Sequence, residues 1–410
     1  MTMRLGKSAA ARVRAVGIAV AIATAGCVPG PGTTSTTSTT STTSTTSTTT
    51  TTTTTTVPPA GSVADVASGG FHSCAALTSG QVKCWGGNVY GVLGDGGTAD
   101  HLSPVAAVGV IDAVEVDANA YNTCARLSGG TVQCWGNNSS GQLGSGTAVA
   151  STSTPVTVSG LNDATSIAVG WWHTCAVVSG GAVKCWGANS DGQLGDGTRT
   201  ARSTPVAVSG ISDAVAVSTG YFSTCAVRAT GQVLCWGGNT GGQLGDGTTT
   251  SRLTPTAVVG ISDATQVLQG GAHWACAVRS GGAIRCWGNS PQMLGNGAAA
   301  GSTTPVDVPG VNSAVSARGS LGHLCVRLAD GSARCWGQNF AGQIGDGTTT
   351  ARPLPTPVDG LTGAREVDAD GNSCALTGGG TVVCWGLNDR GQVGDGTTSR
   401  RLVPTPVVGL

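Results

Sequence analysis

A unit of about fifty residues occurs seven times in this chain and predicts an all-β fold, a seven-bladed β-propeller of four-stranded antiparallel blades. Each copy contains two cysteines ten positions apart, and Trp-Gly follows the second of them. The second cysteines recur every 49 to 51 residues, which is the signature of a repeat architecture. Gly, Val, Ala and Thr dominate the repeats, a composition that suits short strands and tight turns. The pairs are Cys74 with Cys84, Cys124 with Cys134, Cys175 with Cys185, Cys225 with Cys235, Cys276 with Cys286, Cys325 with Cys335, and Cys374 with Cys384.

The first element is a leader at residues 1–26, in which basic residues precede an apolar run at 15–25. This is the pattern of a secretory signal peptide, and the run is too short to span a bilayer as a mature helix. Its end, Thr-Ala-Gly-Cys, resembles the lipobox of bacterial lipoproteins, which implies that Cys27 is acylated. Fourteen of the fifteen cysteines form the pairs, so Cys27 is the one left over. The alternative is an ordinary signal peptide that leaves Cys27 as a spare thiol.

Residues 27–60 follow as a stalk rich in Ser, Thr and Pro, and residues 33–56 are Ser and Thr alone. Such a segment has no apolar side chains to bury, so it cannot offset the entropy of ordering. We expect it to be disordered and to lift the folded part, residues 61–410, off a membrane. A spacer with no role beyond its length is the alternative.

Each repeat begins with a predicted β-hairpin. In the third copy, residues 175–178 form an apolar strand, a Ser-Gly-Gly turn follows, and residues 182–186 return. In this register Cys175 faces Cys185, and Trp186 points to the opposite face of the sheet. Metal binding is the alternative for the cysteines, but nine intervening residues differ from the close pairs of zinc sites. We therefore expect seven disulfides, one within each hairpin, and tryptophans packed between blades.

Two further strands complete each repeat, at residues 205–208 and 214–218 in the third copy. The last repeat has a third strand at 404–408 and then stops without a fourth. A matching strand at 63–67 precedes the first hairpin. We therefore expect this N-terminal strand to pair into the last blade and close the ring, which would remove free sheet edges.

The hairpin is followed by the run Trp-Gly-x-Asn-x-x-Gly-Gln-Leu-Gly-Asp-Gly-Thr. This run resembles the repeats of the regulator-of-chromosome-condensation family, and the resemblance covers residues 61–410. It implies a seven-bladed propeller, and the cysteine pairs are similar to those of an exported bacterial branch. The fifth copy departs, because its run at 287–296 is one residue shorter and carries Pro291. The motif recurs at Trp85, Trp135, Trp186, Trp236, Trp336 and Trp385.

Two recurring polar positions have a structural and a functional interpretation. The Asp of Gly-Asp-Gly-Thr sits between glycines, and we expect it to cap turns, because the alternating oxygens of a calcium loop are missing from the sequence. The histidines two positions before a cysteine do not have a metal or catalytic spacing, and we interpret them as structural hydrogen-bonding groups. These residues are Asp95, Asp196, Asp246, Asp346 and Asp395, with His72, His173 and His323.

Aromatic residues gather just before the first cysteine in the first five repeats. By the symmetry of a propeller these loops ring one end, so we predict a binding surface there with Trp171 and Trp172 at its centre. The alternative is that the rings tuck into the central channel as packing. The predicted binding residues are Phe71, Tyr121, Trp171, Trp172, Tyr221, Phe222 and Trp274.

Composition restricts the function. Without the four basic residues of the leader, 17 basic and 21 acidic residues leave a net charge of −4, unlike the basic excess of nucleic-acid-binding domains. Ser-His-Asp groups, paired catalytic carboxylates and phosphate loops are not recognisable, so we predict no enzyme activity, cofactor or metal. We expect a monomeric, lipid-anchored protein on the outer side of a bacterial membrane or cell envelope. It would bind an unidentified protein or a cell-surface polymer.

The resemblance also implies two other functions. Nuclear members of the family act as guanine-nucleotide exchange factors on a small GTPase, and a secreted propeller of the same superfamily inhibits β-lactamases. Export, disulfides and the acidic mature chain argue against nucleotide exchange. The aromatic loops would suit an inhibitor.

Overall fold

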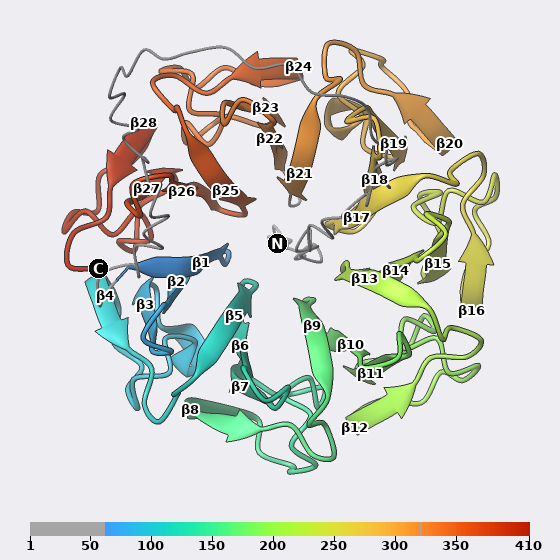
Figure 1. The fold of residues 1–410 in the computed structure, drawn as a ribbon, viewed down its shortest axis with the longest axis horizontal. Coiled ribbons are helices and arrows are strands. Elements are labelled where there is room, and N and C mark those ends of the chain that lie inside the picture. The colour runs from blue at the N-terminus through green and yellow to red at the C-terminus, as the bar shows by residue number, and fades with distance from the viewer. Residues whose placement is uncertain (1–61, 320–321) are drawn as a thin grey trace, which may run out of the picture. The chain divides into compact units, whose positions relative to one another are not determined.

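The computed structural model describes residues 62–319 and 322–410, so the predicted leader, the lipid site at Cys27 and the stalk lie outside the described residues. Seven four-stranded antiparallel sheets are arranged around a common axis (Figure 1). This confirms the predicted all-β propeller. The helices of the described part are two short 3-10 turns, η1 (Val89–Gly91) and η2 (Pro291–Met293).

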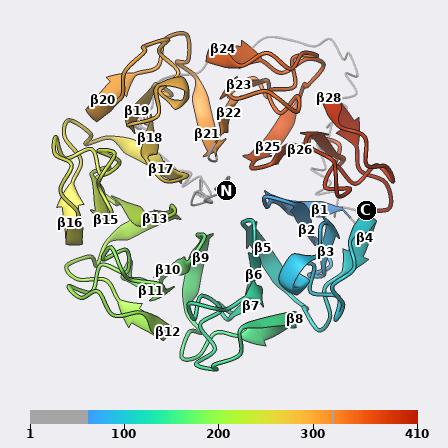
Figure 2. The same ribbon diagram turned by 180° about the vertical axis from the view of Figure 1, so that it is seen from behind.

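Each blade is one continuous stretch of chain whose strands follow in sequence order from the axis to the rim (Figures 1 and 2). The innermost strands are β1 (Val63–Ser68), β5 (Ala113–Ala118), β9 (Ala164–Val169), β13 (Ala214–Thr219), β17 (Ala264–Gly270), β21 (Ala314–Gly319) and β25 (Ala364–Ala369). The second strands are β2 (His72–Leu77), β6 (Asn122–Leu127), β10 (His173–Val178), β14 (Ser223–Arg228), β18 (Trp274–Arg279), β22 (His323–Leu328) and β26 (Asn372–Thr377). The third strands are β3 (Val82–Gly86), β7 (Val132–Asn137), β11 (Val183–Gly187), β15 (Val233–Gly237), β19 (Ile284–Gly288), β23 (Ala333–Gly337) and β27 (Val382–Gly386). The outermost strands are β4 (His101–Ala106), β8 (Ser151–Thr157), β12 (Arg202–Ala207), β16 (Arg252–Ala257), β20 (Ser302–Asp307), β24 (Arg352–Pro357) and β28 (Arg401–Pro406).

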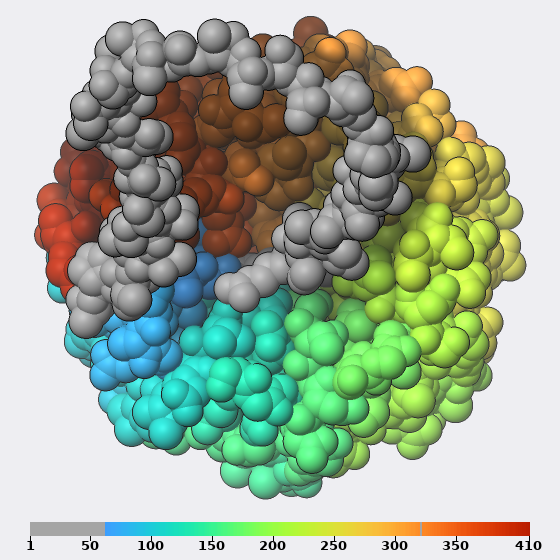
Figure 3. Space-filling view, in the orientation of Figure 1, coloured from blue at the N-terminus to red at the C-terminus, as the bar shows by residue number. Residues whose placement is uncertain are grey.

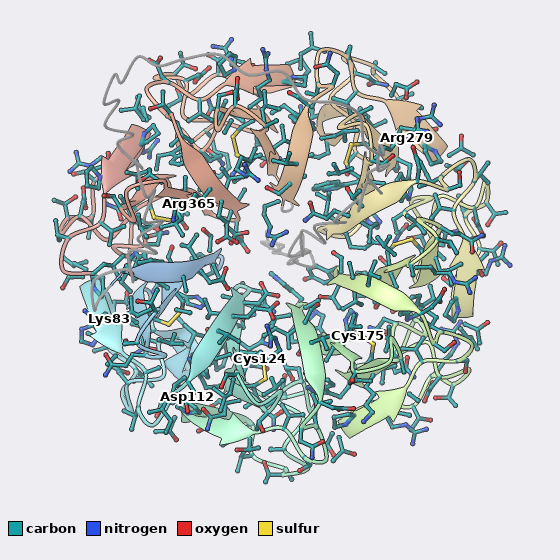
Figure 4. All side chains as sticks on the ribbon, in the orientation of Figure 1. Lys83, Asp112, Cys124, Cys175, Arg279 and Arg365 are labelled. Carbon is teal, nitrogen blue, oxygen red and sulfur yellow. A yellow bond between two sulfur atoms is a disulfide. The ribbon has the colours of Figure 1, made fainter. Side chains whose placement is uncertain are left out.

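The hairpins have the predicted register. In β10 and β11, Cys175 lies opposite Cys185 and Val177 opposite Val183. Every hairpin contains a disulfide between cysteines whose Cα atoms are 4.0–4.1 Å apart, so the seven predicted pairs are confirmed. Figure 4 shows Cys124 and Cys175 midway between the axis and the rim of their blades. The bonds join Cys74 to Cys84, Cys124 to Cys134, Cys175 to Cys185, Cys225 to Cys235, Cys276 to Cys286, Cys325 to Cys335, and Cys374 to Cys384.

The hydrophobic core is a set of layers between neighbouring blades. The disulfide between Cys175 and Cys185 packs with Trp236 of the next blade, whereas Trp186 packs on Leu143 of the preceding blade. Each of the seven tryptophans donates its indole N–H to a loop carbonyl of the preceding blade at 2.7–3.1 Å. The predicted packing of the tryptophans between blades is therefore confirmed, and the blades that are uncovered in the space-filling view, coloured cyan to yellow-green, meet without a break (Figure 3).

The predicted exchange of the N-terminal strand into the last blade is wrong. Strand β1 pairs with β2 in the first blade, with Ala67 opposite Cys74, and the last blade has its own innermost strand, β25. Residues 69–71 alone connect β1 to β2, so this short turn ties the strand to the hairpin that follows it. The fourth strand of each sequence repeat thus belongs to the next blade. Contacts between blades close the ring, such as the 3.1 Å hydrogen bond from the Trp85 indole to the Gln392 carbonyl.

Side chains of several innermost strands link their blade to a neighbouring blade. The backbone N–H of Val116 donates to the Asp65 carboxylate at 2.8 Å, and that of Gln269 donates to the Ser218 hydroxyl at 2.8 Å. An innermost strand has one edge without a neighbouring strand, so these bonds satisfy backbone donors that the sheet leaves open.

Candidate functional site

Most of the residues predicted to bind a partner lie on the short loops between the first and second strands of blades one to four. These loops are residues 69–71, 119–121, 170–172 and 220–222. Their rings form one cluster, which also includes Ala120 and Ala272. We call this cluster the aromatic row, and its members are Phe71, Tyr121, Trp171, Trp172, Tyr221 and Phe222.

Neighbouring rings of the aromatic row contact one another from blade to blade. The ring centroids are 6.5 Å apart for Phe71 and Tyr121, 5.2 Å for Tyr121 and Trp171, and 4.3 Å for Trp171 and Tyr221. Trp171 and Tyr221 are only 4% and 6% exposed, whereas the other four rings are half-buried. The row therefore has a buried base, which has a packing role, and a half-exposed crest.

The tyrosines of the row are neutral. Burial raises the pKa of Tyr221 to about 12, although a hydrogen bond with the Trp172 side chain acts in the opposite direction. Burial and the neighbouring Tyr90 raise the pKa of Tyr121 as well. Both phenols keep their protons at neutral pH, so the row presents an apolar surface with hydroxyl groups.

Backbone hydrogen bonds hold the half-exposed residues in place. The carbonyl oxygens of Phe71, Tyr121, Trp172 and Phe222 each accept from the N–H that follows Trp-Gly in the same blade, at 2.7–2.8 Å. The loops are therefore fastened to the sheets, and the rings stand on a rigid support.

Two residues that the sequence interpretation did not include also contact the row. The ring of Tyr90, which is 44% exposed, meets Tyr121 edge-on at 5.6 Å and 88°. The guanidinium of Arg390 lies over the Phe71 ring at 5.8 Å. Both occupy the second variable position of Asn-x-x-Gly. The variation in residue type at that position from repeat to repeat could have indicated from the sequence that these residues belong to the candidate site.

Trp274 does not join the aromatic row. It is 1% exposed and packs in a core layer with Leu268, Met293 and Trp336. It stands two positions before Cys276, in strand β18 rather than in the preceding loop. Alignment of the repeats by their cysteines would have placed it at the buried histidine position.

The histidines have the predicted structural role. His72 and His173 are buried, and each Nε2 lies 2.8 Å from the threonine hydroxyl of the next blade, Thr123 and Thr224. His323 lies 2.7 Å from the Ser373 hydroxyl in the same way. These side chains join blades.

The Asp of Gly-Asp-Gly-Thr caps a turn, as predicted. One oxygen of Asp196 accepts from the backbone N–H and hydroxyl of Thr198 at 2.9 and 2.7 Å, and the other pairs with Arg202 at 3.2 Å. Burial alone would raise the pKa of Asp196, but these hydrogen bonds together with that of Asn189 hold the pKa below its ordinary value. Both oxygens of this carboxylate are thus bonded to donors of the protein itself, as a turn-capping role requires.

Within residues 62–319 and 322–410, His, Cys, Asp and Glu form no group of three or more that could hold a metal ion. In the same part of the chain, no helix has the length and apolar character needed to cross a membrane.

The fold and its loop surface define a class of protein, a disulfide-containing seven-bladed propeller with an aromatic surface on its loops. The RCC1-like domain family matches residues 112–410, and the regulator of chromosome condensation (RCC1) repeat matches residues 63–92. The chain therefore belongs to the RCC1-like domain family, which confirms the resemblance of its repeats.

Solved structures of other proteins share this fold. Yeast RCC1 (Prp20) bound to Kap60 aligns with a TM-score of 0.70 and 21% identity, over 80% of this chain and 84% of that chain. Prp20p from Saccharomyces cerevisiae, described with its binding properties to Gsp1p and histones, aligns at 0.68 and 21%, over 80% and 86%. Human WBSCR16 aligns at 0.67 and 21%, over 75% and 85%. At this identity the likeness shows the fold alone.

Proposed function

We propose that this chain is a binding module that engages a protein partner through the aromatic row. The observation that carries the proposal is a continuous cluster of rings across four consecutive blades with a half-exposed crest. The seven tryptophans that follow the second cysteines are completely buried, so the crest is not part of that scaffold. Aromatic side chains grouped on an accessible surface are typical anchors of protein interfaces.

The position of the N-terminal end of the propeller supports this role. Ser62, the first described residue, accepts a hydrogen bond from the N–H of Thr78 at 2.8 Å, in the turn after β2. Strand β2 begins at the aromatic end of the blade and finishes at that turn, and six residues of strand span about 20 Å. Ser62 therefore lies at the end of the first blade opposite the aromatic row, and the start of the propeller does not cover the row.

Seven disulfides indicate an oxidising environment outside the cytoplasm. We further propose that lipid on Cys27 anchors the protein to the outer side of a bacterial membrane. Cys27→Ala should then release a soluble form or leave an uncleaved precursor, as measured by fractionation and the mass of the N-terminal peptide. A variant that stays processed and membrane-bound would contradict the anchor.

Truncation of a crest residue tests the binding role. Trp172→Ala should weaken capture of envelope proteins by roughly thirtyfold, since an interface tryptophan typically contributes about 2 kcal/mol or more. Its melting temperature should stay close to that of the wild type because the ring is half-buried. Trp171→Ala should lower the melting temperature instead.

Phe340→Ala is the matched control for that experiment. Phe340 is 61% exposed and occupies the first variable position of the Asn-x-x-Gly loop in the sixth blade, outside the aromatic row. It should leave capture unchanged. Equal capture by the wild type and Trp172→Ala would assign the row to packing.

A further inference from the structure

The half-exposed crest of the aromatic row occupies one position of the repeat, three residues before the first cysteine. In the fifth blade that position holds His273, whose side chain is exposed. The His273 carbonyl accepts from the N–H of Asn289 at 2.7 Å, in the same bond that fastens the crest residues of blades one to four. His273 therefore stands on the same support as the half-exposed rings, which are Phe71, Tyr121, Trp172 and Phe222.

The loop that carries His273 is continuous with the aromatic row. Ala272 packs in the cluster of the row, and the N–H of Tyr221 donates to the Gly271 carbonyl at 3.1 Å. Blades six and seven have glycine at the crest position, at Gly322 and Gly371. The series of rings at this position therefore ends with the imidazole of the fifth blade.

A second regularity places His273 in the same surface. The residue at the second variable position of Asn-x-x-Gly, such as Tyr90 or Arg390, contacts the crest residue of the next blade. In the fourth blade that position is Gly241. A Cβ placed on Gly241 would lie 2.8 Å from the His273 Cβ and 3.0 Å from its Cγ and Nδ1. The glycine thus lies against the imidazole and has no side chain to cover it.

His273 differs from the other crest residues because an imidazole titrates close to neutral pH. Burial lowers the pKa of His273 below its ordinary value, and no charged group among the described residues contributes to that shift. The imidazole is therefore neutral at neutral pH. The charged groups on the elements packed against it are paired with one another, Asp246 with Arg252, Arg279 with Asp263, and Arg285 with Asp307.

A partner that covers this surface would remove more water from the imidazole. Desolvation disfavours the charged form of a histidine, and no acidic side chain of the described residues stabilises a proton on His273. The free protein takes up the proton more readily, because its ring is exposed. Protonation of His273 and binding of the partner therefore oppose each other.

We propose that His273 forms the fifth-blade end of the binding surface and is engaged by the partner in its neutral form, so that acidification releases the partner. This rests on the proposed function and names the regulation of the same surface. A single linked proton weakens binding by at most about tenfold per pH unit once the imidazole titrates.

The test uses the intact propeller on a solid support, loaded with solubilised cell-envelope extract at about pH 7.5 and then stepped to about pH 5. The wild type should release the captured protein at the acid step. His273→Phe keeps a ring, as at Phe71 and Phe222, but does not titrate, so it should retain the protein. Equal release from the two would overturn the proposal, and so would tighter retention by the wild type in acid.

His101→Arg is the matched control. His101 lies on the outermost strand of the first blade and pairs with Asp95 at 3.0 Å. This control should release the protein as the wild type does, and retention would assign the effect to His101 instead. Four other blades have arginine at its position, at Arg202, Arg252, Arg352 and Arg401.

A second variant and a folding check keep the result specific to His273. His273→Gln also lacks a titrating ring and should retain the captured protein at the acid step. Circular dichroism sets that step at a pH where every variant is folded, since the buried histidines destabilise the fold in acid. Release from His273→Gln equal to that from the wild type would contradict the proposal.

Two outcomes separate this proposal from the function on which it rests. If Trp172→Ala abolishes capture at neutral pH but His273→Phe releases the protein like the wild type, the binding surface stands and its acid release is wrong. If Trp172→Ala captures as much protein as the wild type, the aromatic row is not the binding surface, and both proposals are wrong.

Discussion

At the scale of single residues, each buried histidine is one member of a chain of hydrogen bonds that connects neighbouring blades. The Thr224 hydroxyl donates its proton to the Gln193 carbonyl at 2.8 Å, so His173 must donate from Nε2 to the same hydroxyl. The Nδ1 atom of His173 is buried and has no hydrogen-bond partner among the described residues, so a second proton there would create a buried charge without an acceptor, and the ring is neutral. Burial lowers the pKa of His72 and of His173 to about 3.

These lowered pKa values make stability depend on pH. The unfolded chain binds a proton on each histidine near pH 6.5 and the folded chain only near pH 3. Stability is therefore full above pH 6.5 and is lost as the pH falls toward 3, because over this range the unfolded chain binds protons that the folded chain does not. We expect urea unfolding between pH 7 and 4.5 to show this loss.

His173→Asn isolates the contribution of one ring, because asparagine does not titrate. The fold accepts asparagine at this position, since Asn122 and Asn372 occupy it in blades two and seven. The variant should lose less stability per pH unit than the wild type. Parallel curves for the two proteins would rule out the titration of His173 as a source of acid sensitivity.

At the scale of the element, the hairpin is the unit in which local sequence and packing agree. The disulfide lies on one face of β10 and β11, and Trp186 on the other. Each face then contributes to a different layer of the core, so the hairpin joins both of its neighbouring blades.

The paired change Cys175→Ala with Cys185→Ala tests the disulfide of one hairpin. Opening a ten-residue loop should cost about 2–3 kcal/mol of unfolding free energy, because the denatured chain gains freedom. Urea unfolding without reductant measures the loss. Disulfide reduction should then destabilise the variant less than the wild type, and equal losses would show that this bond contributes nothing.

At the scale of the whole molecule, the ring closes through the same contact that joins its other blades. The Gln392 carbonyl of the last blade accepts from Trp85 and from the Ser73 hydroxyl of the first blade. The C-terminal end also reaches the first blade, where the Lys83 ammonium donates to the Gly409 carbonyl at 2.9 Å, near the rim in Figure 4.

Trp85→Phe and Trp236→Phe compare the closing interface with an internal one. In both, the change removes an indole N–H, while a hydroxyl still donates to the same carbonyl, from Ser73 or from Thr224. Each should lose about 1–3 kcal/mol of unfolding free energy, for the lost bond and the smaller ring. A much smaller loss for Trp85→Phe in urea unfolding would show that the ring closes by another contact.

The site could be predicted from the sequence only in part. Clustering of Phe71, Tyr121 and the Trp171–Trp172 pair followed from repeat symmetry, because equivalent loops of a propeller share one end. Burial separates Trp171 from Trp172 although they are adjacent, and Trp274 packs in a core layer outside the aromatic row. Side-chain accessibility depends on neighbouring blades, which periodicity within one repeat does not describe.

The sequence by itself determined the repeat, the hairpin register and the seven disulfides, because alternation along a strand and a ten-residue spacing are local properties. The tertiary structure alone decided that β1 belongs to the first blade, because either neighbouring sheet could accept a strand of that pattern. It also decided that Tyr90 reaches Tyr121. The physical reason is common to both: the choice between partners distant in the chain depends on packing and backbone geometry across blade boundaries.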